Sequence, residues 1–315
     1  MIAAVIPCYR VRNQILDVLK GIGPEVQKIY VVDDACPEAS GKLVIENTTD
    51  PRIEVLFHKQ NLGVGGAVKT GYRKAMKDGA TIIVKLDGDG QMDPHLISRL
   101  IDPIRSKQAD YVKGNRFYDL AYLAKMPGSR KFGNAILSFI NKVVNGYWNV
   151  MDPTNGFTAI AEQALKHLPL EKIHDRFFFE QDMLFRLNTF RAVVMDFPMN
   201  AKYDEETSNL KIWKVLFSFP FKYANRLIKR LFYSYFLRDF NIGSLELILT
   251  FIFMGFGIIF GSIKWIHSIV SMHPATAGTV ILAGLPIILG FQSFLSFLHY
   301  DLTNIPQKPV SSITV

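Results

Sequence analysis

Two apolar stretches near the C-terminus restrict what this chain can fold into more than any other feature. Ile242–Ser262 is apolar apart from Glu246, and Ala277–Phe297 has no charged residue. Each has about 20 residues, the length that an α-helix needs to cross the hydrocarbon core of a bilayer. A soluble protein would have to bury both helices in a further domain, and no residues remain to build one. We therefore expect two transmembrane helices.

The charges around these stretches predict their orientation. Seven lysines and arginines lie within Lys211–Arg238, ahead of the first stretch, whereas the loop over 263–276 carries only Lys264. Cytoplasmic flanks of membrane helices are enriched in basic residues. We therefore expect a multi-pass protein of the cell membrane with two spans, whose N-terminal domain and residues 298–315 lie in the cytoplasm.

The segment Lys211–Arg238 interleaves aromatic and basic residues, and we expect Pro220 to divide it into two helices. In the second helix Lys222, Arg226 and Lys229 fall on one face and apolar residues fall on another. This pattern is typical of helices that lie in a membrane interface. The alternative is an ordinary amphipathic helix packed on the domain.

The first two thirds of the chain alternate between two patterns. Short β-branched runs are followed by stretches with helical spacing, which predicts a mainly parallel sheet covered by helices. We expect strands over 2–7, 28–32, 53–57, 80–84, 110–113, 157–161 and 192–197. We expect helices over 13–21, 40–48, 67–77, 94–106, 129–147 and 176–188.

The strand expected at 80–84 leads into Asp87-Gly88-Asp89. Side chains two residues apart in an extended segment point the same way, so these carboxylates can converge on one hard cation that in turn holds a diphosphate. Two other strands end in polar clusters, Cys8–Arg10 and Asp33–Asp34, and the carboxyl edge of such a sheet is where ligands bind. The alternative for Asp87–Asp89 is a polar turn that closes the strand.

The chain has a net charge of +8 and a pI of about 9.3. This balance favours a polyanionic partner, such as nucleic acid, an anionic membrane surface or phosphorylated substrates. The basic residues cluster beside the apolar stretches, so we expect no nucleic acid. The two cysteines, Cys8 and Cys36, have no metal-ligand spacing and are expected to be free thiols.

Five motifs in order resemble those of a known family. They are Pro7-Cys8-Tyr9, Asp33-Asp34, Asn61-Leu62-Gly63-Val64-Gly65-Gly66-Ala67, Asp87-Gly88-Asp89-Gly90-Gln91-Met92-Asp93-Pro94 and Asp152-Pro153-Thr154-Asn155-Gly156-Phe157. With them the sequence resembles the inverting GT-A glycosyltransferases that use nucleotide sugars. It is most similar to the polyprenyl-phosphate group, which contains dolichol-phosphate mannose synthase and undecaprenyl-phosphate glucosyltransferases.

The resemblance implies an α/β fold of the GT-A type, Rossmann-like, with a mixed, mainly parallel sheet. It places the catalytic domain over 1–208, amphipathic juxtamembrane helices over 209–240, two transmembrane helices over 241–300 and a cytoplasmic tail over 301–315. The implied reaction moves a hexose from a UDP- or GDP-linked sugar to polyprenyl phosphate with inversion, for cell-envelope glycan or glycoprotein assembly. The alternatives are a non-catalytic membrane-bound scaffold with a GT-A-like fold and a glycosyltransferase with another acceptor. Whether the protein forms a homo-oligomer is left open.

The resemblance also implies roles for residues. Asp89, with Asp87 and Gln91, would bind Mg²⁺ or Mn²⁺, and Arg116, Ser129 and Arg130 would bind the acceptor phosphate. Asp89, Arg116 and Arg130 would be the catalytic residues. The nucleotide sugar would be bound by Pro7, Tyr9, Asp33, Asp34, Asn61, Gly63, Asp87, Asp152, Asn155, Gly156, Glu180 and Asp182. The alternative interpretation of Glu180 and Asp182 is that they are charged residues on the surface of a helix.

The implied chemistry needs positive charge, because both substrates are anionic. A lipid phosphate is already an anion at neutral pH, so a strong general base is not required. Arginine holds phosphate in a bidentate way and stays charged, which favours Arg116 and Arg130. Both flank residues 118–128, which have no clear period and are expected to form a lid over the site.

Two departures from the family pattern affect the nucleoside. Arg10 stands where the family often has asparagine, and Ala35-Cys36 stands where Gly-Ser is common. The choice between UDP and GDP is therefore left open.

Overall fold

The computed structural model describes residues 1–118, 128–200 and 212–312, without the side chains of 129, 130 and 212–219. The chain forms two compact units. The first contains Met1–Leu227 together with Pro306–Val315, and the second contains Ile228–Ile305. The C-terminal segment therefore belongs to the same unit as the N-terminus.

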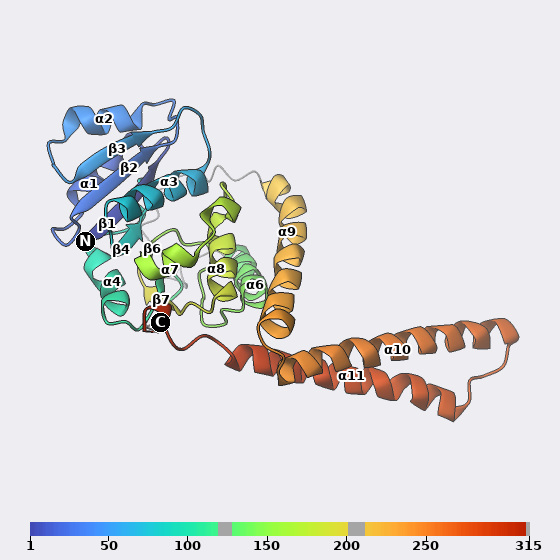
Figure 1. Cartoon of the computed structure of the whole chain (residues 1–315). Helices are drawn as coiled ribbons and strands as arrows, with labels where there is room; N and C mark the ends of the chain where they lie inside the picture. The colour runs from blue at the N-terminus through green and yellow to red at the C-terminus, as the bar shows by residue number, and fades with distance from the viewer. Residues whose placement is uncertain (119–127, 201–211, 313–315) are drawn as a thin grey trace. The chain divides into compact units, whose positions relative to one another are not determined.

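The first unit is built on one seven-stranded sheet with the order β3-β2-β1-β4-β6-β5-β7 (Figure 1). The strands are β1 Ile2–Cys8, β2 Lys28–Asp33, β3 Ile53–Phe57, β4 Ile82–Lys85, β5 Tyr111–Asn115, β6 Thr158–Ala161 and β7 Val194–Pro198. β6 runs antiparallel to both of its neighbours, β4 and β5, and the other neighbouring pairs are parallel. The predicted mixed, mainly parallel α/β sheet is confirmed.

The helices of the first unit cover both faces of this sheet. They are α1 Ile15–Lys20, α2 Ser40–Asn47, α3 Val64–Lys77, α4 Ile97–Arg105, α6 Gly128–Asn145, α7 Glu162–His167, α8 Phe179–Thr189 and α9, which begins at Ile212. Short helical turns lie at Pro94–Leu96, Leu170–Lys172 and Val310–Ser312. The helices confirm the expected alternation, with ends that differ by a few residues, as helix boundaries commonly do. The short helix α7 was not predicted.

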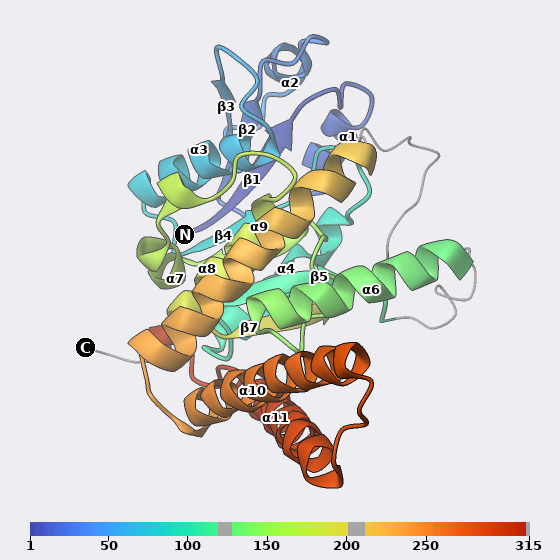
Figure 2. The same cartoon turned by 90° about the vertical axis from the view of Figure 1, so that its right-hand side faces the viewer.

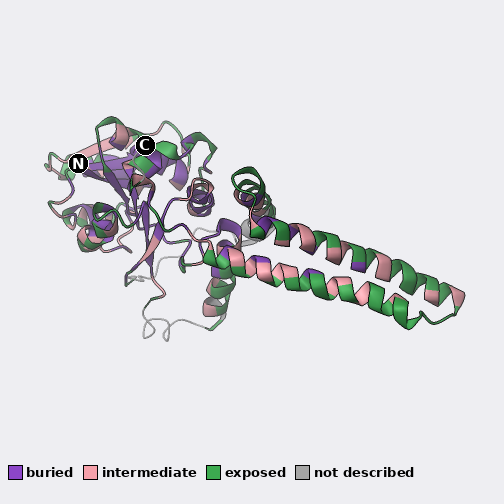
Figure 3. Ribbon diagram, turned by 60° about the horizontal axis from the view of Figure 1, so that its bottom comes forward, coloured by how far each residue is buried: buried purple, intermediate pink, exposed green. Residues whose placement is uncertain are grey.

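The core has two halves because strand side chains alternate between faces. In β1, Ala4 and Ile6 belong to the half that includes α1, α2 and α4, whereas Ala3 and Val5 belong to the half that includes α3, α7 and α8. The five central strands, β1, β2, β4, β5 and β6, are buried on both faces, whereas the edge strands β3 and β7 are partly exposed (Figure 3). Fully burying one isoleucine or valine contributes about 1.5–3 kcal/mol, so this core stabilises the frame that holds the site.

Helix α9 corrects the expected break at Pro220. It runs without interruption over Ile212–Phe232, and an irregular π-helical turn follows at Tyr233–Leu237. Proline removes one backbone donor and crowds the preceding turn, which bends a helix more often than it ends one when packing holds both sides.

The packing of α9 also corrects how its basic residues were interpreted. Lys222 Nζ lies 2.8 Å from His174 Nε2, and Arg226 Nε lies 2.7 Å from Asp182 Oδ1. Tyr223 stacks edge-on against Phe178 with ring centroids 5.3 Å apart. Two of the three cations expected on a membrane-facing surface thus bind the catalytic unit, where α9 lies beside α8 (Figure 2).

The second unit contains the two apolar helices. Helix α10 covers Ile242–Ser271 and α11 covers Ala277–Thr303, and both are long and apolar enough to cross a membrane. Most of their residues are exposed or half-buried within the unit, which suits lipid contact (Figure 3). The helices are longer than the apolar stretches, so the expected loop over 263–276 shortens to 272–276.

Small residues bring α10 and α11 together. A Cβ atom on Gly257 would lie 2.6 Å from Ile287 Cγ1 and 2.8 Å from the carbonyl oxygen of Ala283, so only glycine fits this crossing. Close approach through small residues is common between membrane helices. Glu246 pairs with the other helix, because Ser296 Oγ donates to Glu246 Oε1 at 3.0 Å.

A buried ionic contact joins the end of α9 to the end of α11 within the second unit. Arg230 donates to both carboxylate oxygens of Asp301, at 2.6 and 3.1 Å, and Tyr235 Oη donates to Asp301 Oδ1 at 2.5 Å. All three side chains are nearly fully buried. Arg230 is therefore a structural cation and contributes little to attraction toward a membrane surface.

Candidate active site

The Asp87–Asp89 turn lies directly after β4, at the carboxyl edge of the sheet. Asp89 Oδ1 accepts the backbone N–H of Gln91 at 3.0 Å, which holds the turn in shape. Asp93 then caps the next helical turn by accepting the N–H of His95. Asp87, Asp89 and Gln91 are all partly exposed, so solvent reaches the three residues predicted to bind a metal.

A lysine that the sequence reasoning missed lies against this turn. Lys85 ends β4, and only 2% of its side chain is exposed. Its Nζ atom lies 2.8 Å from Asp87 Oδ1 and 3.5 Å from Glu180 Oε1. Burial lowers the pKa of Lys85, but Asp87 and Glu180 outweigh burial and raise it above its ordinary value. The signal in the sequence was a lysine in an otherwise apolar strand, immediately before the aspartates.

Gly156 touches this ion pair from the neighbouring turn. A Cβ atom on Gly156 would lie 2.3 Å from Lys85 Nζ and 2.4 Å from Asp87 Oδ2. Any other residue would have to push the pair aside. The Asp152–Phe157 motif therefore contacts the Asp87–Asp89 motif through Gly156.

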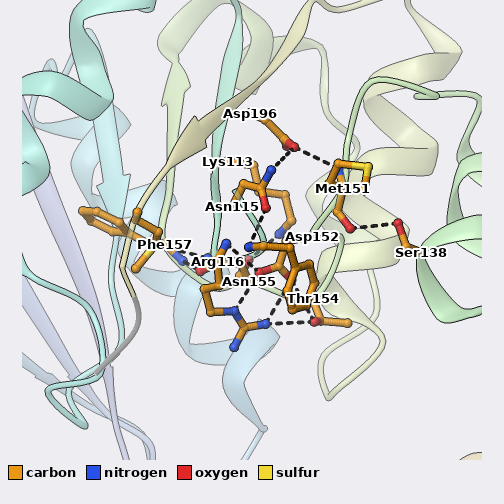
Figure 4. A network of polar contacts seen from close by, with 12 residues as sticks. Lys113, Asn115, Arg116, Ser138, Met151, Asp152, Thr154, Asn155, Phe157 and Asp196 are labelled. Carbon is orange, nitrogen blue, oxygen red and sulfur yellow. Dashed lines mark hydrogen bonds and ion pairs between the residues drawn. The ribbon is translucent and has the colours of Figure 1, made fainter. Parts of the chain in front are cut away.

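Arg116 and Asp152 form a second pair (Figure 4). Arg116 Nε donates to Asp152 Oδ2 at 2.6 Å, and Nη2 donates to Oδ1 at 3.0 Å, which is the bidentate geometry. Nη2 also donates to Thr154 Oγ1 at 3.2 Å. Although burial raises the pKa of Asp152, the contact with Arg116 lowers it below its usual value. The guanidinium is thus held in one orientation, with 22% of its side chain exposed.

A second buried lysine, Lys113, contacts the Asp152–Phe157 turn (Figure 4). Lys113 Nζ donates to the carbonyl oxygen of Asn155, and the Asn155 Oδ1 atom accepts the N–H of Phe157. Lys113 and Lys85 both lie in register with Thr158, one on each side of β6. Burial lowers the pKa of Lys113 to about 8. Asn155 therefore shapes the turn through its own backbone and side chain.

The carboxylates of Asp33 and Asp34 hold turns. Asp33 accepts the backbone N–H groups of Cys36 and Gly41, both at 2.7 Å. Asp34 accepts the N–H groups of Leu62 and Gly63, at 2.8 and 2.7 Å, and contacts His58 Nδ1 at 2.7 Å. Both are almost fully buried. Their geometry shapes the loops around the expected nucleoside pocket.

The other residues expected around the nucleoside lie at the end of β1 and on the loop between β3 and α3. Tyr9 is 40% exposed just after β1, and the Arg10 guanidinium lies 5.5 Å from its ring centroid. Pro7 is half-buried at the end of β1. Asn61 Nδ2 donates to the carbonyl oxygen of Asp34 at 3.2 Å. Cys8 and Cys36 are free thiols, as expected.

Glu180 and Asp182, both on α8, have different partners. Glu180 faces Lys85 at the site, whereas Asp182 is fully buried and accepts the N–H of His174 at 3.0 Å. Asp182 also pairs with Arg226 of α9. The interpretation as helix-surface charge is therefore wrong for Asp182, whose contacts anchor α9 and the 173–175 loop.

The predicted acceptor residues are described only in part. Ser129 and Arg130 lie in the first turn of α6, but their side chains lie outside the described residues. The expected lid over 118–128 lies outside them as well, apart from its two end residues. Arg116 is the one acceptor-site residue from the sequence prediction whose side chain is described.

The oxygen donors of the Asp87–Asp89 turn fit a magnesium or manganese ion that also takes ligands from water and substrate. Carboxylate and amide oxygens are hard donors, and Mg²⁺ commonly takes one or two carboxylates and completes its shell with water and substrate phosphate. Within the described ranges, no group of three or more His, Cys, Asp or Glu side chains is arranged to hold a metal ion. The residues present therefore fit a cation shared with a diphosphate.

A mixed sheet with an Asp-x-Asp turn at its carboxyl edge is the arrangement of a nucleotide-sugar transferase, as the resemblance implied. The chain belongs to glycosyl transferase family 2, whose family model matches residues 3–168. The predicted family and the prediction of a glycosyltransferase are thereby confirmed.

Two curated relatives are similar to this chain over most of their own length. One is the UDP-N-acetylglucosamine–dolichyl-phosphate N-acetylglucosaminyltransferase of Methanococcus voltae, 33% identical over 53% of this chain and 72% of the relative. The other is the undecaprenyl-phosphate mannosyltransferase of Micrococcus luteus, 29% identical over 63% of this chain and 82% of the relative. Both are named for a polyprenyl-phosphate acceptor.

Solved structures are similar in fold. Glucosyl-3-phosphoglycerate synthase from Mycobacterium tuberculosis, solved with Mn²⁺, UDP and glucosyl-3-phosphoglycerate, has a TM-score of 0.52 and 18% identity. The match covers 73% of this chain and 79% of that chain. At this identity the comparison supports the fold alone.

Proposed function

We propose that this protein transfers a hexose from a UDP- or GDP-linked sugar to polyprenyl phosphate, with inversion at the anomeric carbon. The observation that carries the proposal is the Asp87–Asp89 turn at the sheet edge of a family 2 chain that also has two apolar helices. The acceptors named for its relatives support a lipid phosphate. The product would serve cell-envelope glycan or glycoprotein assembly.

On the nucleotide side, the loops held by Asp33 and Asp34 would frame the nucleoside, together with Pro7, Tyr9 and Asn61. Asp89, with Asp87 and Gln91, would hold Mg²⁺ or Mn²⁺ against the diphosphate. The bound cation would stabilise the negative charge that develops on the leaving nucleoside diphosphate.

On the acceptor side, Arg116 would bind the lipid phosphate, with Ser129 and Arg130 as further contacts. Helix α6, which carries Ser129 and Arg130 in its first turn, also supports a lipid partner. Four apolar side chains that recur at helical spacing are exposed on it, namely Phe132, Ile136, Phe139 and Ile140. An exposed apolar stripe next to cationic residues is typical of helices that contact lipid.

In the reaction, a phosphate oxygen of the lipid attacks the anomeric carbon, and the bond from that carbon to the diphosphate breaks. The electron pair of the broken bond leaves with the nucleoside diphosphate. The attacking oxygen is already an anion, so the protein's own task is to bring two anions together and orient them. The fixed guanidinium of Arg116 suits this task, because Asp152 holds its plane in place.

We further propose that the protein lies in the cell membrane with its catalytic domain in the cytoplasm. Residues on both sides of the helix pair, up to Leu227 and from Pro306 onward, belong to the same compact unit. This favours an even number of crossings, with both flanks on one side. We take 1–208 as the catalytic domain, 209–240 as juxtamembrane, 241–300 as the two spans and 301–315 as the cytoplasmic tail.

The proposal is tested by incubating the purified full-length protein with a panel of UDP- and GDP-sugars. Undecaprenyl or dolichyl phosphate serves as acceptor, with Mg²⁺ or Mn²⁺ and a parallel arm containing soluble acceptors. Formation of a lipid-phosphate sugar supports the proposal. Preferential transfer to a soluble acceptor, or no transfer from any donor, would contradict it.

A further inference from the structure

Lys85 is a buried charge that the proposed reaction does not use. Its side chain is 2% exposed at the end of β4, and its Nζ atom lies between Asp87 Oδ1 and Glu180 Oε1, at 2.8 and 3.5 Å. Burying an ammonium costs free energy unless carboxylates compensate its charge. Both carboxylates belong to the residues assigned to the nucleotide sugar, so this ion pair is part of the donor site.

The position of the ammonium is fixed by its surroundings. Lys85 pairs in the sheet with Val5 on one side and Thr158 on the other. Gly156 closes the remaining side, since a Cβ atom there would lie 2.3 Å from Lys85 Nζ. The ammonium therefore stays beside Asp87 unless the Asp152–Phe157 turn itself moves.

The charges decide what this arrangement does. Asp87 and Glu180 carry two negative charges and Lys85 carries one positive charge, so the group has one net negative charge. Without Lys85, Asp87 and Glu180 would be two carboxylates without their counter-charge. Carboxylates are the ligands that hard cations prefer. With Lys85 in place, a divalent cation at this turn meets a positive charge instead. Only an additional anion, such as a diphosphate, removes that obstacle.

We propose that Lys85 is a positioning residue that acts as the internal counter-cation of the donor site. It fixes Asp87 and keeps the carboxylates from capturing a divalent cation alone, so the metal binds appreciably only together with the nucleoside diphosphate. This inference rests on the proposed function for the identity of the donor. It goes beyond that function because it makes metal binding dependent on the bound nucleoside diphosphate.

The experiment measures Mn²⁺ binding to the full-length protein in detergent by the electron paramagnetic resonance signal of free Mn²⁺. Titrations are run without nucleotide and with UDP or GDP. For the wild type we expect at least tenfold tighter Mn²⁺ binding with the matching diphosphate than without it. In Lys85→Met we expect Mn²⁺ binding without nucleotide to tighten at least tenfold, which corresponds to about 1.4 kcal/mol.

Two further variants make the result specific. Lys85→Gln is neutral but keeps a hydrogen-bond donor for Asp87. If Lys85→Met does not fold, we expect the same tightening of Mn²⁺ binding without nucleotide in Lys85→Gln. Lys69→Met removes a different buried lysine, which is 7% exposed on α3 and pairs with Asp175. Its Mn²⁺ affinity should match the wild type, because that lysine lies on another element of the fold.

Two results would overturn the inference. One is a folded Lys85 variant whose Mn²⁺ affinity without nucleotide stays within twofold of the wild type. The other is a wild type that binds Mn²⁺ equally well with and without either diphosphate. Neither readout depends on sugar transfer, so failure of the proposed function, seen as no lipid-linked product, is distinguishable from failure here.

Discussion

The Asp110 carboxylate, fully buried at the start of β5, accepts the backbone N–H of Val310 at 2.9 Å, from 200 residues further along the chain. Oδ2 also accepts the N–H of Val193 at 2.8 Å, and Oδ1 accepts the N–H of Ser311 at 3.3 Å. One side chain thereby ties the segment after the second apolar helix to the sheet that carries the active site.

Replacing this carboxylate should destabilise the first unit. Asp110→Ala leaves the buried N–H of Val193 and the half-buried N–H groups of Val310 and Ser311 without their acceptor. An unsatisfied buried donor costs about 1–3 kcal/mol, and a half-buried donor costs less. We expect the free energy of unfolding to fall by about 3 kcal/mol, measured by denaturant titration of the full chain in detergent. The control is Asp102→Ala, a carboxylate 63% exposed on α4, which should change stability by less than about 0.5 kcal/mol. Equal effects of the two variants would contradict this role for Asp110.

Gly156→Ala should disable the donor site while the protein stays folded. The added Cβ atom would collide with Lys85 Nζ and Asp87 Oδ2, so the ion pair must shift. A displacement of about 1 Å in a positioned group can reduce rates by about a hundredfold, and we expect a loss of that size in kcat/KM for the nucleotide sugar. Gly133→Ala is the matched control, because nothing lies within 4 Å of its Cβ position. Wild-type kinetics in Gly156→Ala would show that the pair is not part of the site.

Arg116→Lys should weaken use of the acceptor more than use of the donor. A lysine cannot contact both oxygens of Asp152 and also present a planar donor edge to a phosphate. We expect KM for polyprenyl phosphate to rise at least tenfold and KM for the nucleotide sugar to change less than threefold. Arg105→Lys, at a residue 45% exposed on α4, should leave both constants unchanged. A larger effect on the nucleotide-sugar KM would reassign Arg116 to the donor.

Asp196 should make stability depend on pH between about 4 and 6. Burial raises the pKa of its carboxyl to about 6, so the folded state holds a proton that the unfolded state has already released. The folded wild type therefore loses stability as the pH rises through this window. Asp196→Asn keeps an oxygen that can accept the N–H of Met151 and removes the charge.

The predicted consequence is that Asp196→Asn is more stable than the wild type at pH 7, by up to about 3 kcal/mol, since one pKa unit corresponds to about 1.4 kcal/mol. This advantage should disappear below pH 4, where the wild-type carboxyl is protonated in both states. Unfolding free energies of both proteins across pH 3.5–7.5 measure it. A difference that does not vary with pH would mean that Asp196 is not the titrating group.

Local features of the sequence predicted the frame of the molecule well. The strands and helices of the sheet follow from alternation and spacing within short windows, and Asp87 and Asp89 follow from their place after a strand. The two apolar helices follow from length and composition. Each of these properties depends on neighbours in the chain, so the sequence displays it directly.

Contacts between distant segments could not be predicted in the same way. Lys85 looked like part of an apolar strand, but its partner Glu180 comes from α8, and the partner of Asp152 comes from the loop after β5. On α9, Lys222 contacts His174 and Arg226 reaches Asp182, a choice of partners that only packing reveals. Long-range pairing of charges decides these cases, and helical periodicity carries no information about it.

Removing the Asp89 carboxylate tests the central claim most directly. Wild type and Asp89→Asn are incubated with the preferred nucleotide sugar, polyprenyl phosphate and Mn²⁺, and the lipid-phosphate sugar is quantified by mass spectrometry. Asparagine keeps the size of the side chain and a hydrogen-bond acceptor for the Gln91 N–H, so the fold should persist by circular dichroism. We predict product from the wild type and at least a thousandfold lower rate from Asp89→Asn. Equal product from both proteins, or none from the wild type with any donor, would contradict it.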